Sequence, residues 1–346
     1  MFEIHTAPEL AKEHCDNVEQ MCKTAIINLK ERIIFTRSQE DFKDMSTSEI
    51  DYANKQFQKF ICWLEDNNYE HLSGIIMAKP HTMLDIYAEI SENFNFDIYE
   101  GSEMVKAFAT DGIKGKVVKD NIEKIFNYKN FSYYFGYAFA KKLNVTICPY
   151  CNRQFTFTVL NESEIQDGRR EEVIRPEFDH YFAQEKYPIF ALSFYNLIPS
   201  CHICNSNIKG RRELDIKKHY HPYITENKNF KFCYDKADPA NSNVNTTIKI
   251  DYRKIPKAKE TCEFFYLDII YEAHNDVSDK LWKIYNEYPP DRFNEILKAL
   301  INIGENFSRQ ELLDIIFNEY KVNDPDKEIL GKLRSDLYEQ MKENYK

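Results

Sequence analysis

Two stretches of the sequence decide how its middle part folds: Cys148-Pro149-Tyr150-Cys151 and Cys201-His202-Ile203-Cys204. Each stretch is a Cys-x-x-Cys pair, and 49 residues separate the two pairs. Two such pairs supply the four thiolates of one tetrahedral zinc site. Because four thiolates leave the ion no open position for water, we expect this zinc to stabilise the fold without taking part in chemistry.

The polar residues near the two pairs are the candidates for chemistry. Asp179 and His180 lie between the pairs, and Asn196 and Asn205 flank the second pair. A histidine accepts a proton near neutral pH, whereas carboxylate and amide oxygens are ligands that Mg²⁺ prefers. Neighbours on one strand point to opposite faces, so Asp179 and His180 can serve one site only at a twisted strand end. Asn196 is expected to brace the histidine loop by bonding backbone groups. Metal-assisted phosphodiester cleavage fits this set of residues best.

The order of these residues resembles the HNH endonuclease family. The resemblance is carried by three stretches within residues 144–222: Phe178-Asp179-His180-Tyr181-Phe182, Ser193-Phe194-Tyr195-Asn196-Leu197-Ile198-Pro199-Ser200-Cys201, and Cys204-Asn205 with Lys209-Gly210. It implies a ββα-metal finger in which His180 is the general base and Asn196 is the structural asparagine. It also implies that Asp179 and Asn205 hold a catalytic Mg²⁺ or Mn²⁺ ion, and that the four cysteines form the structural zinc site of the zinc-bearing subset.

Two features of the sequence depart from the family pattern. Asn205 stands where the last histidine of the name is usual, and the usual Asn-x-x-Lys spacing is stretched by one residue between Asn205 and Lys209. Asn207 therefore remains an alternative metal ligand, although the spacing from Asn196 favours Asn205.

The rest of the chain predicts an α+β protein that is mostly helical, with helical regions at 1–143 and, after short strands, at 223–346. Helical spacing covers 7–36, a capping box at Ser46 and Glu49 begins the next helix, and further short helices are expected at 120–127 and 131–143. We assign the aromatic residues of 131–139 to core packing rather than base stacking. In the middle region we expect a hairpin of 145–147 and 155–160, a surface loop over 161–175 and a strand at 178–182. In the C-terminal region we expect a loop over 238–245, a strand at 246–252, and helices from 263 to the end, broken at Pro289-Pro290 and 323–326.

Charge is distributed unevenly along this chain of net charge −10. Residues 263–346 hold 18 acidic and 11 basic side chains, whereas residues 203–221 hold 2 acidic and 5 basic ones. A local basic stretch beside a site matters more for nucleic-acid binding than the overall charge. The candidates for phosphate contacts are Lys209, Arg211, Arg212, Lys217 and Lys218.

The remaining histidines and cysteines are expected to be structural. We predict that His202 is not a ligand and that His219 and His221 belong to a loop, since two imidazoles alone rarely hold a metal. The five single cysteines stand in apolar surroundings and are expected to be buried: Cys15, Cys22, Cys62, Cys233 and Cys262. No apolar run is long enough to cross a membrane and no signal peptide precedes the first helix, so we expect a cytoplasmic protein.

The complete layout is also similar to the HNH subunits of Septu-type, retron-associated anti-phage systems. That similarity implies an ABC-like or SMC-like ATPase partner, and we expect DNA before RNA as the substrate. The main alternative is a zinc-ribbon protein that binds nucleic acid or acts as a scaffold without catalysis. A zinc deaminase is set aside because the sequence lacks a His-x-Glu before a Pro-Cys-x-x-Cys motif.

Overall fold

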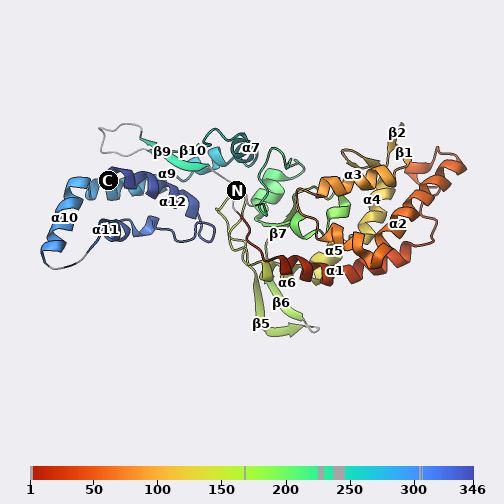
Figure 1. Ribbon diagram of the computed structural model, residues 1–346, viewed down its shortest axis with the longest axis horizontal. Coiled ribbons are helices and arrows are strands. Elements are labelled where there is room, and N and C mark those ends of the chain that lie inside the picture. Colours follow the sequence, from red (N-terminus) through yellow and green to blue (C-terminus); the bar gives the residue numbers. More distant parts are fainter. Residues whose placement is uncertain (1–2, 167–168, 225–229, 237–245, 304, 306) are drawn as a thin grey trace.

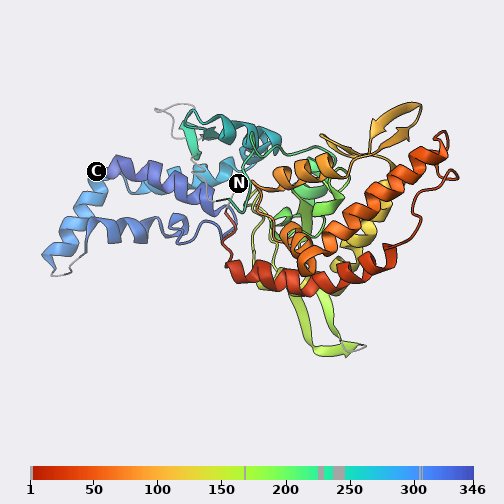
Figure 2. The same ribbon diagram turned by 45° about the vertical axis from the view of Figure 1, so that its right-hand side comes forward.

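The computed structural model describes residues 3–166, 169–224, 230–236, 246–303, 305 and 307–346. It is an α+β protein in which helices predominate and the strands form two-stranded antiparallel sheets. Figures 1 and 2 show the N-terminal helices at one end, the C-terminal helices at the other, and residues 144–222 between them. Within the described ranges, no helix combines the length and the apolar character needed to span a membrane.

The N-terminal region contains six helices: α1 (Pro8–Leu29), α2 (Thr47–Ile76), α3 (Met83–Asn93), α4 (Lys116–Ile125), α5 (Tyr128–Tyr134) and α6 (Gly136–Leu143). The predicted capping box at α2 is confirmed, because Glu49 N–H donates to Ser46 Oγ and Ser46 N–H donates to Glu49 Oε2. The expected helix at 7–36 ends earlier, at Leu29. Two small hairpins in this region were not expected from the sequence: β1 (Asp97–Glu100) with β2 (Glu103–Lys106), and β3 (Phe108–Ala109) with β4 (Gly112–Ile113).

The middle region contains the strands that matter for the candidate site. The expected hairpin of 145–147 and 155–160 is reduced to one bridge between Ile147 and Phe155 across the first cysteine pair. The surface loop expected at 161–175 is wrong, because β5 (Val159–Gln166) and β6 (Arg169–Ile174) form a hairpin that projects from the molecule (Figure 1). Near the site, β7 (Glu177–His180) pairs with β8 (Leu197–Ser200), and η4 (Ile203–Lys209) follows as a short π-helix.

The C-terminal region begins with a hairpin of β9 (Lys231–Lys236) and β10 (Thr246–Asp251). The loop expected at 238–245 lies outside the described residues. Six helices follow: α7 (Pro256–Phe264), α8 (Leu267–Glu272), α9 (Asn275–Glu287), α10 (Pro290–Asn302), α11 (Arg309–Ile316) and α12 (Gly331–Lys342). The predicted break at Pro289-Pro290 is confirmed, since α10 begins at Pro290.

Both helical regions pack against the middle region. On the N-terminal side, Ser193 Oγ donates to the carbonyl of Ile75 at the end of α2. On the C-terminal side, Tyr271 Oη donates to the carbonyl of Cys151, and the Leu330 amide donates to the carbonyl of Asn152. The helices therefore hold the first cysteine pair in place from outside the middle region.

The five single cysteines are only partly as expected. Cys15, Cys22 and Cys262 are buried, and Cys233 is half-buried. Cys62 is exposed, so its predicted burial is wrong. Its neighbours Phe60 and Ile61 point into the core, and the helical turn of α2 directs position 62 outward.

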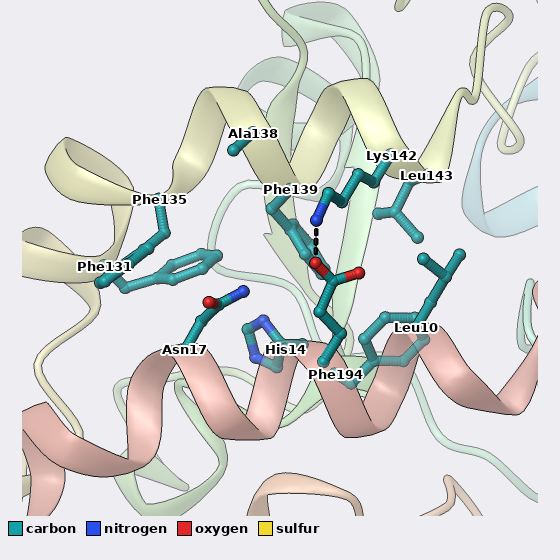
Figure 3. A pocket seen from close by; sticks show the side chains of 11 residues that line it. Leu10, His14, Asn17, Phe131, Phe135, Ala138, Phe139, Lys142, Leu143 and Phe194 are labelled. Atoms are coloured by element: carbon teal, nitrogen blue, oxygen red, sulfur yellow. Dashed lines mark hydrogen bonds and ion pairs between the residues drawn. The ribbon is translucent and has the colours of Figure 1, made fainter. Parts of the chain in front are cut away.

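His14 is a buried titratable group in the contact between α1 and the middle region. Figure 3 shows it on α1 facing the aromatic side chains of α5 and α6. Its Nε2 lies 2.7 Å from the carbonyl oxygen of Leu192, and its ring centroid lies 4.7 Å from that of Phe139. Burial lowers the pKa of His14 to about 4, although the bond to Leu192 opposes the shift. The imidazole is therefore neutral in the folded protein at pH 7.

We expect this histidine to make the protein less stable in mild acid. Between pH 6.5 and about pH 4 the unfolded chain binds the proton and the folded chain does not, so the free energy of unfolding falls as the pH falls. From pH 7 to pH 5 the loss at this site is about 2 kcal/mol. Chemical unfolding at pH 7 and at pH 5 measures this loss of unfolding free energy in the wild-type protein and in His14→Gln, where we expect a smaller loss. Equal losses in the two proteins would contradict the assignment.

Candidate active site

The four cysteines of the two Cys-x-x-Cys pairs meet in one buried cluster. Their Sγ atoms all lie within 4.8 Å of one another. The Cys201 amide donates to Cys148 Sγ at 3.4 Å, and the Cys204 amide donates to Cys201 Sγ at 3.4 Å. A tetrahedral zinc ion with bonds of about 2.3 Å places its sulfur ligands about 3.8 Å apart. The cluster therefore has the size and the donor atoms of a four-cysteine zinc site.

The thiol groups themselves need a cation to ionise together. Burial raises the pKa of Cys148 and the adjoining cysteines raise that of Cys204, whereas hydrogen bonds from the adjoining cysteines lower the pKa values of Cys151 and Cys201, so the four thiols do not ionise together by themselves. A bound Zn²⁺ reverses this effect because it stabilises the thiolates directly. Zinc would be held by all four sulfurs and would tie residues 148–151 to residues 201–204.

Strand β7 presents its side chains to two different sides of the site. Asp179 pairs with Ile198 of β8, and His180 pairs with Leu197. Glu177 and Asp179 contact η4, whereas His180 contacts residues on the other side of the strand. This alternation follows from the pleat of a strand, and the strand ends at His180.

His180 is held so that one ring nitrogen remains open. Its Nε2 lies 3.0 Å from the carbonyl oxygen of Ala191, and the ring of Tyr128 packs against it edge to face with centroids 4.5 Å apart. Among the described residues, Nδ1 has no hydrogen-bond partner, and it is not sealed from solvent. Burial lowers the pKa of His180 to about 4, with the bond to Ala191 opposing the shift. The neutral ring therefore carries its proton on Nε2 and an open lone pair on Nδ1.

Asn196 braces the loop that follows His180. Its Oδ1 accepts from the Phe182 amide at 2.7 Å, and its Nδ2 donates to the carbonyls of Phe182 and Phe190. All three bonds are to the backbone, as the bracing role expected for this residue requires. The same loop contains Ala191, so Asn196 also fixes the carbonyl that orients His180.

Asp179 is almost completely buried, and both of its oxygens are engaged. Tyr150 Oη donates to Oδ2 at 2.5 Å, and Lys209 Nζ donates to Oδ1 at 2.7 Å. Burial, followed by the charge of Asp179, raises the pKa of Tyr150, so its hydroxyl stays protonated and donates. Lys209 also donates to the carbonyl of His180 at 2.7 Å. The expectation that Lys209 contacts phosphate is therefore wrong, because its side chain is only 4% exposed and is committed to Asp179.

Removing the Lys209 ammonium should destabilise the protein strongly. In Lys209→Met the Asp179 carboxylate stays buried without its cation, which costs about 3–5 kcal/mol for a buried ion pair. Urea unfolding measures the loss, and Lys217→Met, which removes an exposed lysine, is the matched control. Adding Asp179→Asn to Lys209→Met should recover part of the loss. Equal stability of Lys209→Met and Lys217→Met would contradict the buried pair.

Asn205 is oriented by a glutamate that the sequence analysis did not single out. Glu177 accepts from Asn205 Nδ2 at 2.8 Å, from Ser206 Oγ at 3.0 Å, and pairs with His202 Nδ1 at 2.7 Å. Burial pushes the pKa of Glu177 upward, but the bonds from these three residues outweigh it and hold the pKa below its usual value. The sequence feature that could have identified Glu177 is its position two residues before Asp179, because residues two apart on a strand lie on the same face. Because Nδ2 of Asn205 is bonded to Glu177, its Oδ1 is the atom left to act as a ligand.

The extra residue between Asn205 and Lys209 is accommodated by the π-helix. The Gly210 amide bonds the Asn205 carbonyl at 2.8 Å, a bond across five residues where an α-helix has four. The wider turn brings both Asn205 and Lys209 to β7. Asn207 is exposed and does not line the cleft, which favours Asn205 of the two candidates.

A cleft of about 470 Å³ opens at this point, and Asp179, His180 and Asn205 all line it. Arg211 is exposed at its edge, in keeping with a phosphate contact. Arg212 does not line the cleft. Its guanidinium donates to the carbonyls of Ile208 and Phe264 and lies 4.3 Å from the centroid of the Phe264 ring. The predicted phosphate contact of Arg212 is therefore wrong, because the side chain joins η4 to α7. Lys217 and Lys218 are exposed outside the cleft.

The other histidines take structural places. His202 is exposed and pairs with Glu177. His219 is buried and its Nδ1 accepts from the Asp215 amide at 2.9 Å, and the His221 ring packs 4.2 Å from that of Tyr181. Across the described ranges, the four-cysteine cluster is the one group of three or more His, Cys, Asp or Glu side chains with metal-ligand spacing.

The donor set near His180 is compatible with a second, oxygen-bound ion. Asp179 and Asn205 both line one cleft, and their carboxylate and amide oxygens would be the protein ligands of such an ion, with water completing the shell. Each carboxylate oxygen keeps a second lone pair beside its present bond. The Lys209 ammonium competes for the same charge, so this site would bind the ion more weakly than an unpaired carboxylate would.

Comparison with known proteins adds no relative to this description. The chain matches no protein-family model, and it matches neither a curated protein nor a solved structure. The assignment of a function therefore depends on the geometry of the site itself.

Proposed function

We propose that this protein is a metal-dependent endonuclease of the HNH type, which hydrolyses phosphodiester bonds with His180 as the general base. The observation that carries the proposal is the setting of His180. One ring nitrogen is fixed by the Ala191 carbonyl, the other has no hydrogen-bond partner among the described residues, and His180 lines one cleft together with Asp179 and Asn205. A base held in this way can take a proton from water in a fixed direction.

Each residue of the cleft has a distinct part in the proposed reaction. His180 Nδ1 accepts the proton of the attacking water, and Asn196 keeps the loop of the histidine in place. Arg211 contacts a phosphate oxygen. A Mg²⁺ or Mn²⁺ ion on Asp179 and Asn205 would stabilise the charge on the phosphate and on the leaving 3′ oxygen. The expected products carry a 5′-phosphate and a 3′-hydroxyl.

The buried pair of Asp179 and Lys209 supports the same reading. The Lys209 ammonium bonds both the Asp179 carboxylate and the His180 carbonyl, so it fixes the two residues relative to each other. Tyr150, which lies inside the first cysteine pair, bonds the other oxygen of Asp179. The zinc cluster is thereby joined directly to the residue that would hold the catalytic ion.

Cleavage of single-stranded DNA, of supercoiled plasmid and of single-stranded RNA by the purified chain tests the proposal. We expect cleavage with Mg²⁺ or Mn²⁺, inhibition by EDTA, and DNA as the better substrate. If the protein binds nucleic acid but does not cleave it with any divalent metal ion, the result would favour the alternative, a zinc-ribbon protein that binds nucleic acid without catalysis.

We also propose an ABC-like or SMC-like ATPase partner and a role in anti-phage defence, as the similarity in layout implies. The support from the molecule is a set of apolar side chains exposed at the base of the β5–β6 hairpin: Phe155, Phe157, Val159, Val173 and Ile174. Exposed apolar clusters of this kind are common at protein interfaces. An ATPase of this class that neither binds the purified chain nor changes its cleavage rate would contradict the proposed partner.

A further inference from the structure

Tyr128, whose ring packs against His180, also lines a second hollow of about 490 Å³. We call it the tyrosine hollow, and its lining comes from α5, the start of α6 and the residue after β6: Tyr128, Lys129, Asn130, Ser132, Tyr133, Tyr137 and Arg175. This lining contains three tyrosines and two cations, and no carboxylate. Such a composition is notable in a chain of net charge −10.

The helices α5 and α6 divide their aromatic residues between the core and this hollow. Phe131 and Phe139 are buried, as the sequence analysis expected. Tyr133 is 62% exposed, and the adjoining Tyr134 is 57% exposed, with the two rings edge to face at 4.9 Å. Core packing therefore explains only the phenylalanines. Tyr133, which lines the hollow, and Tyr134 next to it are therefore mostly exposed to solvent.

The two cations of the hollow are placed to meet an anion. Arg175 donates to Ser132 Oγ at 2.7 Å and to the Pro176 carbonyl at 2.9 Å, and its guanidinium lies 5.4 Å from the ring centroids of both Tyr137 and Phe178. Lys129 is exposed at the start of α5. Among the described residues, neither cation forms an ion pair with a carboxylate. Their charge is available to a ligand.

The hollow also lies close to the candidate active site. The Tyr128 ring lines it and packs against the His180 imidazole, with the ring centroids 4.5 Å apart. Phe178, which lies under the Arg175 guanidinium, is the neighbour of Asp179 on β7. The tyrosine hollow is therefore one aromatic ring away from the proposed general base.

We propose that the tyrosine hollow binds single-stranded nucleic acid close to His180. Bases stack on Tyr133 and Tyr137, which line the hollow, and on Tyr134 next to it, while Lys129 and Arg175 contact the phosphates. This combination of aromatic platforms and cations is how proteins hold single strands without reading their sequence. In a duplex the base faces are already stacked on one another, so the platform selects single strands. The inference rests on the proposed function and names its substrate class.

Binding can be tested without cleavage in a His180→Ala background. The probes are fluorescent 15-mers of oligo(dT) and oligo(rU) and a duplex of the same length, measured by anisotropy at two salt concentrations. We expect the double variant Tyr133→Ala with Tyr134→Ala to bind single strands about tenfold or more weakly, since each stacked base contributes substantially. Tyr52→Ala, which removes an exposed tyrosine of α2 outside the hollow, is the matched control and should bind normally. Lys129→Ala should weaken binding and reduce its salt dependence.

The outcomes separate this inference from the proposed function. Unchanged single-strand affinity in the tyrosine variant, or no binding of any oligonucleotide by the intact protein, overturns the inference and would favour a protein as the occupant. A preference for duplex overturns it as well. If the tyrosine variant loses binding but the protein with His180 intact cleaves no substrate, the result supports the binding site and contradicts the proposed nuclease activity. The dT and rU probes show whether the strand is DNA or RNA.

Discussion

Replacement of His180 by alanine is expected to lower the rate of nucleic-acid cleavage by about 10³-fold, within the range that a general base contributes. The loss follows from the open Nδ1 atom, because alanine leaves no group to take the proton of the attacking water. Single-turnover cleavage of a labelled strand, with Mg²⁺ in excess, gives the rate directly.

The structure also predicts what His180→Ala leaves unchanged. The imidazole bonds one backbone carbonyl and contacts one ring, so the zinc content and the overall fold should persist. His81→Ala, which removes an exposed histidine outside the site, is the matched control and should cleave normally. A His180→Ala protein that keeps its zinc and cleaves at the wild-type rate would show that another group is the base.

Replacement of Cys148 or Cys201 by serine is expected to have the largest effect on stability. Each change removes one of four clustered thiolates and with it tight zinc binding, which in small zinc modules is on the order of 10 kcal/mol of folding free energy. That amount is comparable to the total stability of a typical domain. We expect residues 144–222 to lose their packing, together with the α7 and α8 contacts to the first cysteine pair.

Zinc analysis and thermal unfolding of the purified variants measure this effect. The wild-type protein should carry one zinc ion per chain, and the Cys148→Ser protein should carry none and melt far lower. Cys62→Ser is the matched control, since Cys62 is exposed and lies outside the cluster. Full stability of a zinc-free Cys148→Ser protein would mean that the cluster holds no structural metal.

The sequence was sufficient to place the residues that depend on local spacing. Each Cys-x-x-Cys pair is a short turn, and the structure brings the two turns together into one cluster. The capping box at Ser46 and Glu49 is equally local, because its two bonds join residues three apart. Asn196 and Asn205 follow from their positions relative to the second pair.

The contacts inside the site could not be predicted from the sequence, because they depend on which side chains the fold buries. Lysine and arginine are normally exposed, so Lys209 and Arg212 in a basic stretch indicate a charged surface. Only the packed structure shows that the Lys209 ammonium is buried against Asp179 and the His180 carbonyl of β7, and that Arg212 stacks on Phe264 of α7. Tyr150 and Glu177 were missed for the same reason, since their partners are at least 25 residues away.

The β5–β6 hairpin was missed for a different physical reason. A half-buried strand shows alternating apolar and polar residues, but this hairpin projects from the body of the molecule (Figure 2). Residues 161–172 are mostly polar and show no alternation of apolar and polar residues, and the strand register shifts between Asn161 and Ile165. Composition alone suggested a loop.

The metal dependence of cleavage by the intact, zinc-loaded protein tests the central claim most directly. We expect no cleavage after brief EDTA treatment that spares the thiolate-bound zinc, and recovery of cleavage when Mg²⁺ or Mn²⁺ is added back. The zinc content of the same samples shows whether the loss of cleavage comes from removal of Mg²⁺ or Mn²⁺ or from removal of the thiolate-bound zinc. Cleavage that persists at full rate in EDTA, or that returns only with Zn²⁺, would contradict an oxygen-bound ion on Asp179 and Asn205 beside His180.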